Sequence, residues 1–398
     1  MTSDNTPTPQ QLRGCLREMR PNARSIAALT SNPACQRRRI MDIAQVSAND
    51  LARRLDSAPQ YGQSPFAIAT GQHFENQLKR GSDHALLIDA LRPLFNWDEG
   101  FSPAKTDLNR LQGHSVGHDL IKARAQATND LIRALLSGES PAPHLIDHPV
   151  LTLEVMGTTA YLEPDALVFG SETGFELIEV KSFAVIDDQA DPDKLTAAAK
   201  QVAVYGLALE QIMLQLQEND KLLESSFVLV APKNFGRQPT AHRLPLARRI
   251  KSLKRSLRRL GSVRELMSGL PVDFTFDTPS KLELESRINQ LPILYVPSCM
   301  EACDMALYCR NEVICSGDPS RLGTAARDAL IGVKSIEEAL RIAQSSSQED
   351  RGDVPADVAE TLRDAWASIE RARVGLSPID TEWMREMRTV EFNDGGEG

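Results

Sequence analysis

The chain has 398 residues, of which 41% are hydrophobic and 25% are charged, and its formal net charge is −9 at pH 7. This length accommodates one large domain with an appendage or two domains, and this composition excludes wholesale disorder and a fibrous repeat. The negative charge repels nucleic acid, so nucleic-acid binding would require local basic patches.

The residues at the start of the chain give no sign of export. Met1 to Pro9 are polar and lack a basic segment followed by an apolar one, and no apolar run in the chain approaches membrane-spanning length. Six cysteines in a chain of this length indicate metal ligation or free thiols rather than a disulfide framework. We therefore expect a cytoplasmic protein without a membrane partner.

Helical patterns dominate the first third of the chain. Residues 1–22 are rich in Pro, Thr and Gln and are predicted to be disordered. A helix is predicted from Gly71, with Phe74 and Leu78 on one face. Residues 85–143 also show helical patterning, which we interpret as a helical insertion.

A β-hairpin is predicted between Asp165 and Lys181, around a turn bounded by two glycines. If the turn is symmetric, Phe169 lies opposite Phe175. Asp165 then lies opposite Glu179, and Lys181 shares the face of Glu179. Two carboxylates about 5 Å apart across a strand pair repel each other unless they share a cation, and a divalent metal would supply one. Taken alone, these charges could also form an ordinary solvated strand face.

A long helix and a buried strand follow the hairpin. Residues 192–216 carry the longest helical pattern, with Pro192 suited to the first turn, and they place Gln201 and Tyr205 on one face. Residues 226–231 are apolar and β-branched, which predicts a buried strand and hence a strand–helix–strand unit.

The segment from Arg243 to Arg264 reverses the charge of the chain, with nine basic residues and no acid. Apolar residues at helical spacing from Ile250 to Leu260 predict an amphipathic helix with a basic face. Such a face can be a solvated surface or can contact the phosphates of nucleic acid, and both interpretations are open at this point.

Three cysteines, Cys299, Cys303 and Cys309, lie within eleven residues after the α/β region. Thiolates this close together are usually held by a metal or a cluster, and three of them need a fourth ligand from elsewhere. Cys35 is the candidate and Cys315 the alternative. Zinc is the competing metal, but closed zinc sites are commonly built from Cys-x-x-Cys pairs, which this chain lacks.

Taken in order, three short patterns resemble the successive motifs of PD-(D/E)xK nucleases of the RecB-like branch: Pro164-Asp165, Glu179-Val180-Lys181 and Gln201-x-x-x-Tyr205. The first motif of that family is a glycine followed four residues later by an acid or a histidine. Gly71 and Glu75 resemble it, and His73 is the alternative ligand.

The resemblance implies a role for each of these residues. Three carboxylates are implied to hold Mg²⁺ or Mn²⁺: Glu75, Asp165 and Glu179. Lys181 is implied to position or deprotonate the attacking water and to offset charge at the phosphate. Gln201 and Tyr205 are implied to orient this lysine and the nucleic-acid backbone.

The cysteines resemble those of an iron–sulfur subset of the same nucleases, which includes the AddAB-type helicase–nucleases and the CRISPR spacer-acquisition nucleases. In that subset one cysteine precedes the first motif and three follow the nuclease core. The resemblance implies a four-iron, four-sulfur cluster held by Cys35, Cys299, Cys303 and Cys309.

The expected architecture is α/β: a restriction-endonuclease-like core, with a mixed central sheet flanked by helices, over residues 23–316, and a C-terminal helical appendage with an acidic tail over residues 317–398. The expected function is metal-dependent hydrolysis of phosphodiester bonds in single-stranded or end-bearing DNA, in repair, recombination or defence. The chain has no Gly-x-x-x-x-Gly-Lys-Ser/Thr phosphate loop, so a helicase motor would have to be a partner. Two alternatives are a catalytically idle iron–sulfur DNA-binding or adaptor protein and a zinc-stapled structural protein.

Overall fold

The computed structural model describes residues 6–57, 65–81, 83–110, 118–187, 189–216, 223–234, 236, 238–296, 298–345, 347 and 349–374. The chain forms two compact units, the first comprising residues 1–293 and 297–308 and the second residues 294–296 and 309–398. The boundary therefore falls after Tyr308, where the sequence suggested a boundary after Ser316. The acidic tail lies outside the described residues.

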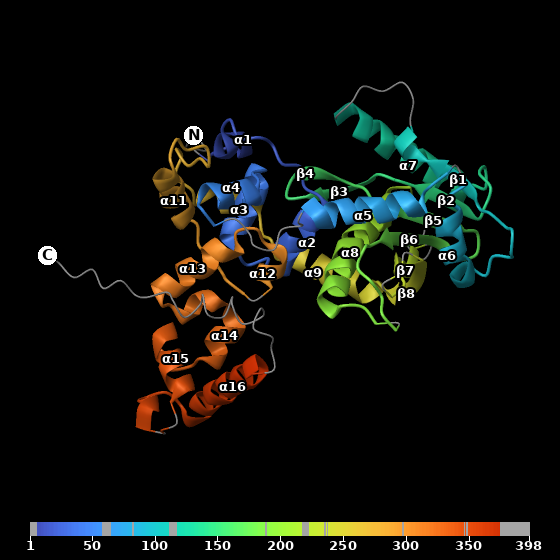
Figure 1. Ribbon diagram of the computed structural model, residues 1–398. Coiled ribbons are helices and arrows are strands. Elements are labelled where there is room, and N and C mark those ends of the chain that lie inside the picture. The colour runs from blue at the N-terminus through green and yellow to red at the C-terminus, as the bar shows by residue number, and fades with distance from the viewer. Residues whose placement is uncertain are drawn as a thin grey trace. The chain divides into compact units, whose positions relative to one another are not determined.

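A six-stranded mixed sheet is the centre of the first unit (Figure 1). Its strands, in spatial order, are β1 (Ala104–Asp107), β2 (His144–Asp147), β5 (Ala166–Gly170), β6 (Gly174–Val180), β7 (Leu223–Pro232) and β8 (Pro239–Pro245). The pairs β1–β2 and β6–β7 are parallel, and the other neighbours are antiparallel. As a result, the carboxyl ends of β1, β2, β6 and β7 meet at one edge of the sheet, together with the amino end of β5.

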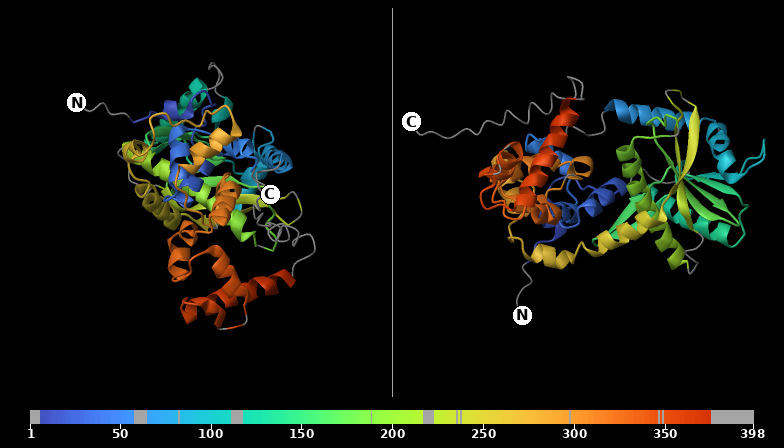
Figure 2. Two further views of the ribbon diagram at one scale, coloured as in Figure 1. Left: turned by 90° about the vertical axis from the view of Figure 1, so that its left-hand side faces the viewer. Right: turned by 90° about the horizontal axis from the view of Figure 1, so that it is seen from below.

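Alternating side chains build a hydrophobic core on each face of this sheet. Leu177 and Leu229 face a core shared with α8 (Pro192–Gln215), whereas Ile178 and Val230 face a core shared with α5 (Pro65–Leu78) and α6 (Ala85–Phe95). The helices α6 and α8 therefore lie on opposite faces of the sheet (Figure 2). The predicted α/β class, with a mixed sheet flanked by helices, is confirmed at this level.

The first unit contains further elements outside this sandwich. β3 (Leu151–Val155) and β4 (Thr158–Leu162) form a separate antiparallel hairpin. The remaining helices are α1 (Pro9–Arg13), α2 (Ala23–Ser31), α3 (Gln36–Ala44), α4 (Ala48–Arg54), the 3₁₀ turn η1 (Leu108–Arg110), α7 (His118–Leu136), α9 (Ala247–Arg258), α10 (Val263–Ser268), α11 (Lys281–Asn289) and α12 (Cys299–Ala302). Within the described ranges, every helix is too short or too polar to cross a bilayer.

Two expectations about the first part of the chain are wrong. Residues 85–143 are more than a helical insertion, because β1 lies among them and pairs with β2 in the central sheet. Within residues 1–22, the structure contains α1 instead of disorder, because the buried side chain of Leu12 packs in the fold and its carbonyl accepts a hydrogen bond from the Phe276 N–H at 2.9 Å. The partner that stabilises each element, β2 for β1 and Phe276 for α1, is distant in the sequence.

The second unit is helical, in agreement with the predicted helical appendage. Its elements are the latter part of α13 (Ala306–Ser316), η3 (Pro319–Leu322), α14 (Thr324–Ala329), α15 (Ile336–Gln344), η4 (Glu349–Arg351) and α16 (Ala356–Val374). Ile342, Val354 and Ala359 form its small hydrophobic core.

Candidate active site

The hairpin β5–β6 has the predicted register. Phe169 pairs with Phe175, and their ring centroids are 4.6 Å apart. Asp165 precedes β5 by one residue, so the same register continues toward Glu179. The backbone N–H of Val180 donates a hydrogen bond to Asp165 Oδ2 at 2.6 Å, which fixes this carboxylate beside the end of β6. The side chain of Glu179 is only 2% exposed.

A chain of polar contacts leads from Glu179 to helix α8. Lys181 Nζ lies 2.6 Å from Glu179 Oε1 and donates a hydrogen bond to Gln201 Oε1 at 3.2 Å. Gln201 Nε2 in turn donates to the Tyr205 hydroxyl at 2.8 Å. The predicted helix of residues 192–216 is confirmed: Pro192 opens α8 and the Asp191 carboxylate caps it. The four residues therefore form one connected row.

Burial sets the electrostatics of this row. Burial first, and then the nearby Glu179 carboxylate, raises the pKa of Asp165 to about 8. Burial likewise raises the pKa of Glu179, against the opposing effect of Lys181. For Lys181, burial lowers the pKa, but the carboxylates of Glu179, Asp165 and Glu75 together outweigh it, so the net pKa is raised and the side chain stays cationic. One buried carboxyl group, Glu179, and one partly buried carboxyl group, Asp165, thus face a partly buried cation.

Glu75, on α5, lies close enough to Asp165 and Glu179 for its charge to help raise the pKa of both carboxyl groups. His73 is exposed. Glu75 Oε1 lies 2.7 Å from Lys79 Nζ, which also donates to the backbone carbonyl of Asp165 at 3.0 Å. His148 Nε2 is 3.6 Å from Glu75 Oε1, and contact with His148 is the main reason that the pKa of Glu75 falls to about 2. Of the two first-motif candidates, the geometry favours Glu75.

The three carboxylates predicted to hold a metal do not converge tightly. Among the described residues, one group of His, Cys, Asp and Glu has ligand atoms that all lie within 4.8 Å of one another, and it consists of Asp107, Asp147 and His148. Glu75, Asp165 and Glu179 are therefore arranged more widely than this.

Sequence reasoning missed the residues that support these carboxylates. Arg124 of α7, which is buried, donates to Glu163 Oε2 at 2.6 Å and to the His148 carbonyl at 2.9 Å, and so ties the loops before β5 and after β2 together. Lys79 follows Glu75 by four residues, a spacing that signals an ion pair on a helix, but only the tertiary fold brings it to Asp165.

Three of the predicted cluster cysteines lie around α2, α3 and α12 of the first unit. Cys35 is the buried N-cap of α3. Asn32 Nδ2 lies 3.4 Å from Cys299 Sγ, and Arg38 Nη1 lies 3.9 Å from Cys303 Sγ. Burial raises the pKa of the Cys303 thiol, against the effect of Arg38. Cys309 and Cys315 belong to the second unit.

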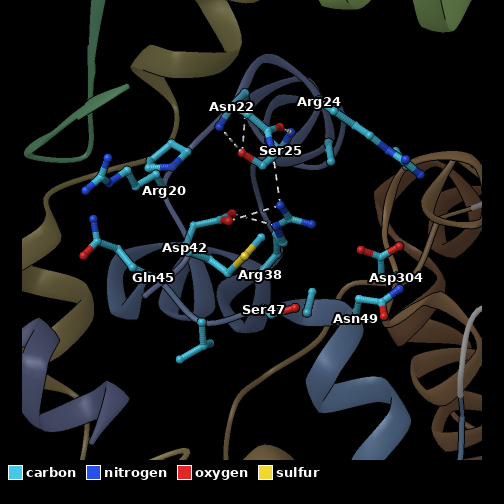
Figure 3. Close-up of a pocket in the computed structure, with 16 residues that line it drawn as sticks. Arg20, Asn22, Arg24, Ser25, Arg38, Asp42, Gln45, Ser47, Asn49 and Asp304 are labelled. Carbon is cyan, nitrogen blue, oxygen red and sulfur yellow. Dashed lines mark hydrogen bonds and ion pairs between the residues drawn. The ribbon is translucent and has the colours of Figure 1, made fainter. Parts of the chain in front are cut away.

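A cavity of about 210 Å³ adjoins this region, between α2, α3, the start of α4 and the residues after α12. Figure 3 shows the guanidinium group of Arg38 held on the cavity wall between the Asp42 carboxylate and the Ser25 carbonyl, with Nε 2.6 Å from Asp42 Oδ2. Arg38 therefore links the cavity wall to Cys303.

The predicted amphipathic basic helix is α9. Ile250 and Leu253 are buried, and Lys254 forms an ion pair with Glu210 of α8. Four basic side chains at spacings of three or four residues are exposed in one stripe, which we call the α9 basic stripe: Arg248, Lys251, Arg255 and Arg258. Arg243 lies on β8 and makes a bidentate ion pair with the buried Glu176 at 2.8 Å, so its role is structural.

Comparisons with known proteins leave the family of the chain undetermined. No protein-family model matches it, and no curated protein matches it either. The solved structure of SSO0001 aligns with 12% sequence identity over 45% of this chain and 87% of its own, with a TM-score of 0.19.

Proposed function

We propose that the protein is a metal-dependent deoxyribonuclease with a restriction-endonuclease-like core. The observation that carries this proposal is the connected row Glu179, Lys181, Gln201 and Tyr205 beside the partly buried Asp165, at the sheet edge where the carboxyl ends of four strands meet. In open α/β sheets, ligands bind at this kind of edge.

The donor set fits a hard divalent cation. Asp165, which is partly buried, and Glu179, which is buried, both have raised pKa values, so a second positive charge beside Lys181 would stabilise their ionised forms. Carboxylate oxygens suit Mg²⁺ and Mn²⁺. When bound, such an ion supplies an activated water and neutralises charge at phosphorus. Glu75 would complete the ligand set directly or through water.

The protein residues then have distinct roles. Asp165 and Glu179 hold the cation, and the Val180 N–H keeps Asp165 in place. Because its pKa is raised, Lys181 acts as a fixed cation that orients the attacking water and offsets charge on the phosphate, and is a poor base. Gln201 accepts a hydrogen bond from Lys181 and donates one to Tyr205, which holds the lysine on the side of α8.

The test is cleavage of single-stranded and duplex DNA labelled at either end, in the presence of Mg²⁺ or Mn²⁺. We expect products that appear only with the divalent ion and disappear with a chelator. A catalytically idle DNA-binding protein would bind the DNA without cleaving it. A structural protein would neither bind nor cleave it.

We also propose that the α9 basic stripe contacts the DNA backbone. Replacing Lys251, Arg255 and Arg258 together by alanine should weaken binding of single-stranded DNA about equally for all sequences. The slope of log affinity against log salt concentration should shrink by about 2, since each lost phosphate contact removes about 0.7. Fluorescence anisotropy at several salt concentrations measures both.

The control for that experiment has the same change in net charge. Alanine at Arg133, Lys194 and Lys281, whose side chains are 59%, 60% and 44% exposed, removes three positive charges elsewhere on the first unit. If both triple variants lose the same affinity, the stripe has no special part in binding.

A further part of the proposal is the iron–sulfur cluster expected from the sequence, held by Cys299, Cys303, Cys309 and a fourth thiolate from Cys35, with Cys315 as the alternative to Cys35. Protein purified without oxygen should be coloured and contain iron and sulfide in equal amounts. Cys303→Ser should lose most of the iron, whereas Cys15→Ser, at an exposed cysteine, should keep it. A colourless protein with stoichiometric zinc would contradict the cluster.

A further inference from the structure

A second group of metal-ligating side chains lies at the same edge of the sheet, at the ends of β1 and β2. These strands are parallel, and their last residues, Asp107 and Asp147, are direct partners in the sheet. His148 follows immediately and turns the chain away with a left-handed backbone, at a φ of 51°. Local geometry thus brings two carboxylates and one imidazole together.

The distances within this group leave room for an ion. His148 Nδ1 lies 3.2 Å from Asp147 Oδ2 and 3.6 Å from Asp107 Oδ1. This nitrogen is buried and lies within ion-pair distance of both oxygens, in a geometry that does not meet that of a hydrogen bond. The side chains of Asp147, Asp107 and His148 are 2%, 18% and 29% exposed, so the group is largely shielded from water. The ring nitrogen and the carboxylate oxygens face the same point and form ion pairs there, which a bound ion would replace.

Surrounding side chains hold the three groups in this orientation. His84 Nε2 lies 2.9 Å from Asp147 Oδ2, and Lys79 Nζ lies 2.7 Å from Oδ1 of the same carboxylate. Glu75 Oε1, 3.6 Å from His148 Nε2, lies on the opposite side of the ring from Asp107. Outer contacts of this kind fix the orientation of metal-binding carboxylates and imidazoles.

We propose that Asp107, Asp147 and His148 bind a divalent transition-metal ion, at a site separate from the one proposed at Asp165 and Glu179. One imidazole nitrogen with two carboxylates is a donor set for Mn²⁺ and its neighbours in the first transition row. Mg²⁺ prefers oxygen ligands and ideal octahedral geometry, so this site discriminates against it. Lys79 contacts residues of both sites, since it also binds Glu75 and the Asp165 carbonyl.

The inference does not depend on nuclease activity and is tested without it. The full chain carrying Asp165→Asn and Glu179→Gln, which removes the other proposed site, is titrated with Mn²⁺ alone by calorimetry. We expect one bound ion, and we expect pulsed electron paramagnetic resonance to show coupling of that ion to an imidazole nitrogen. Mg²⁺ should bind at least about tenfold more weakly.

Two further substitutions assign the ligands. Asp107→Asn keeps the acceptor for the Asn109 N–H, now 2.9 Å from Asp107 Oδ1, so the turn should persist while Mn²⁺ affinity falls at least about tenfold. His148→Asn suits the left-handed backbone and should abolish the nitrogen coupling. Glu139→Gln, at an exposed acid after α7, should change neither result.

Other outcomes overturn the proposal. One alternative is an ion-pair network in which Lys79 and His148 neutralise the carboxylates of Asp107 and Asp147 without a metal. In that case the Asp165→Asn, Glu179→Gln protein binds no Mn²⁺. If it binds an ion without nitrogen coupling, or with an affinity that Asp107→Asn and His148→Asn leave unchanged, the ion lies elsewhere.

Discussion

Replacing Lys181 by alanine is expected to lower the rate of DNA cleavage by about 10³-fold at saturating Mg²⁺ or Mn²⁺. In the described part of the chain, Lys181 is the only basic residue whose side chain directly contacts Glu179, and Gln201 holds its ammonium group in place. Its removal takes away a positive charge that is fixed beside the reacting phosphate. The measurement is single-turnover cleavage of end-labelled single-stranded DNA.

Two other substitutions separate chemistry from folding. Lys181→Met keeps the aliphatic stem of the side chain and should be as inactive as Lys181→Ala, with DNA affinity close to that of the native protein. Lys194→Ala removes a lysine in the first turn of α8 whose side chain is 60% exposed. This variant should cleave DNA at the native rate. Native activity in Lys181→Ala would place the active site elsewhere.

The fold could be predicted from the sequence where its signals are local. The hairpin register followed from a symmetric glycine-bounded turn, and α8 followed from a long apolar pattern with a proline at its start. β1 and β2 were missed, because they have four residues each and three of the four residues of β1, Lys105 to Asp107, are polar. Their strand structure arises from pairing across a long stretch of sequence, which no local pattern reveals.

The same limit applies to the candidate site. The order of Asp165, Glu179, Lys181, Gln201 and Tyr205 in the sequence pointed to one place, and the structure brings these residues together. The spacing in the sequence gave no signal that Lys79 and Arg124 support the site. A lysine or arginine on an amphipathic helix is usually solvated, and only the packing of α5 and α7 against the sheet edge turns these two inward.

Burying Asp165 and Glu179 side by side opposes the stability of the metal-stripped protein. The pKa of Asp165 is raised from 3.8 to about 8 on folding. Between these two pH values the carboxyl group is protonated in the folded state and ionised in the unfolded state. The free energy of unfolding should therefore fall by about 1.4 kcal/mol per pH unit between those two values, apart from the contributions of other groups. Stability is greatest below the unfolded pKa and is lost as the pH rises toward the folded pKa.

Asp165→Asn should remove this contribution, because the amide does not ionise and can still accept the Val180 N–H. We expect the chelator-treated variant to unfold at a higher temperature than the native protein, by a margin that grows from pH 5 to pH 8, and to be inactive. Mg²⁺ should raise the unfolding temperature of the native protein and have a much smaller effect on the variant, because only the native protein binds the ion at the Asp165 and Glu179 site. Asp130→Asn, at an acid whose side chain is 55% exposed, should follow the native pH profile. A variant that is less stable than the native protein at pH 8 would mean that the Asp165 carboxylate has a favourable partner, and the electrostatic argument for a cation at this site would fail.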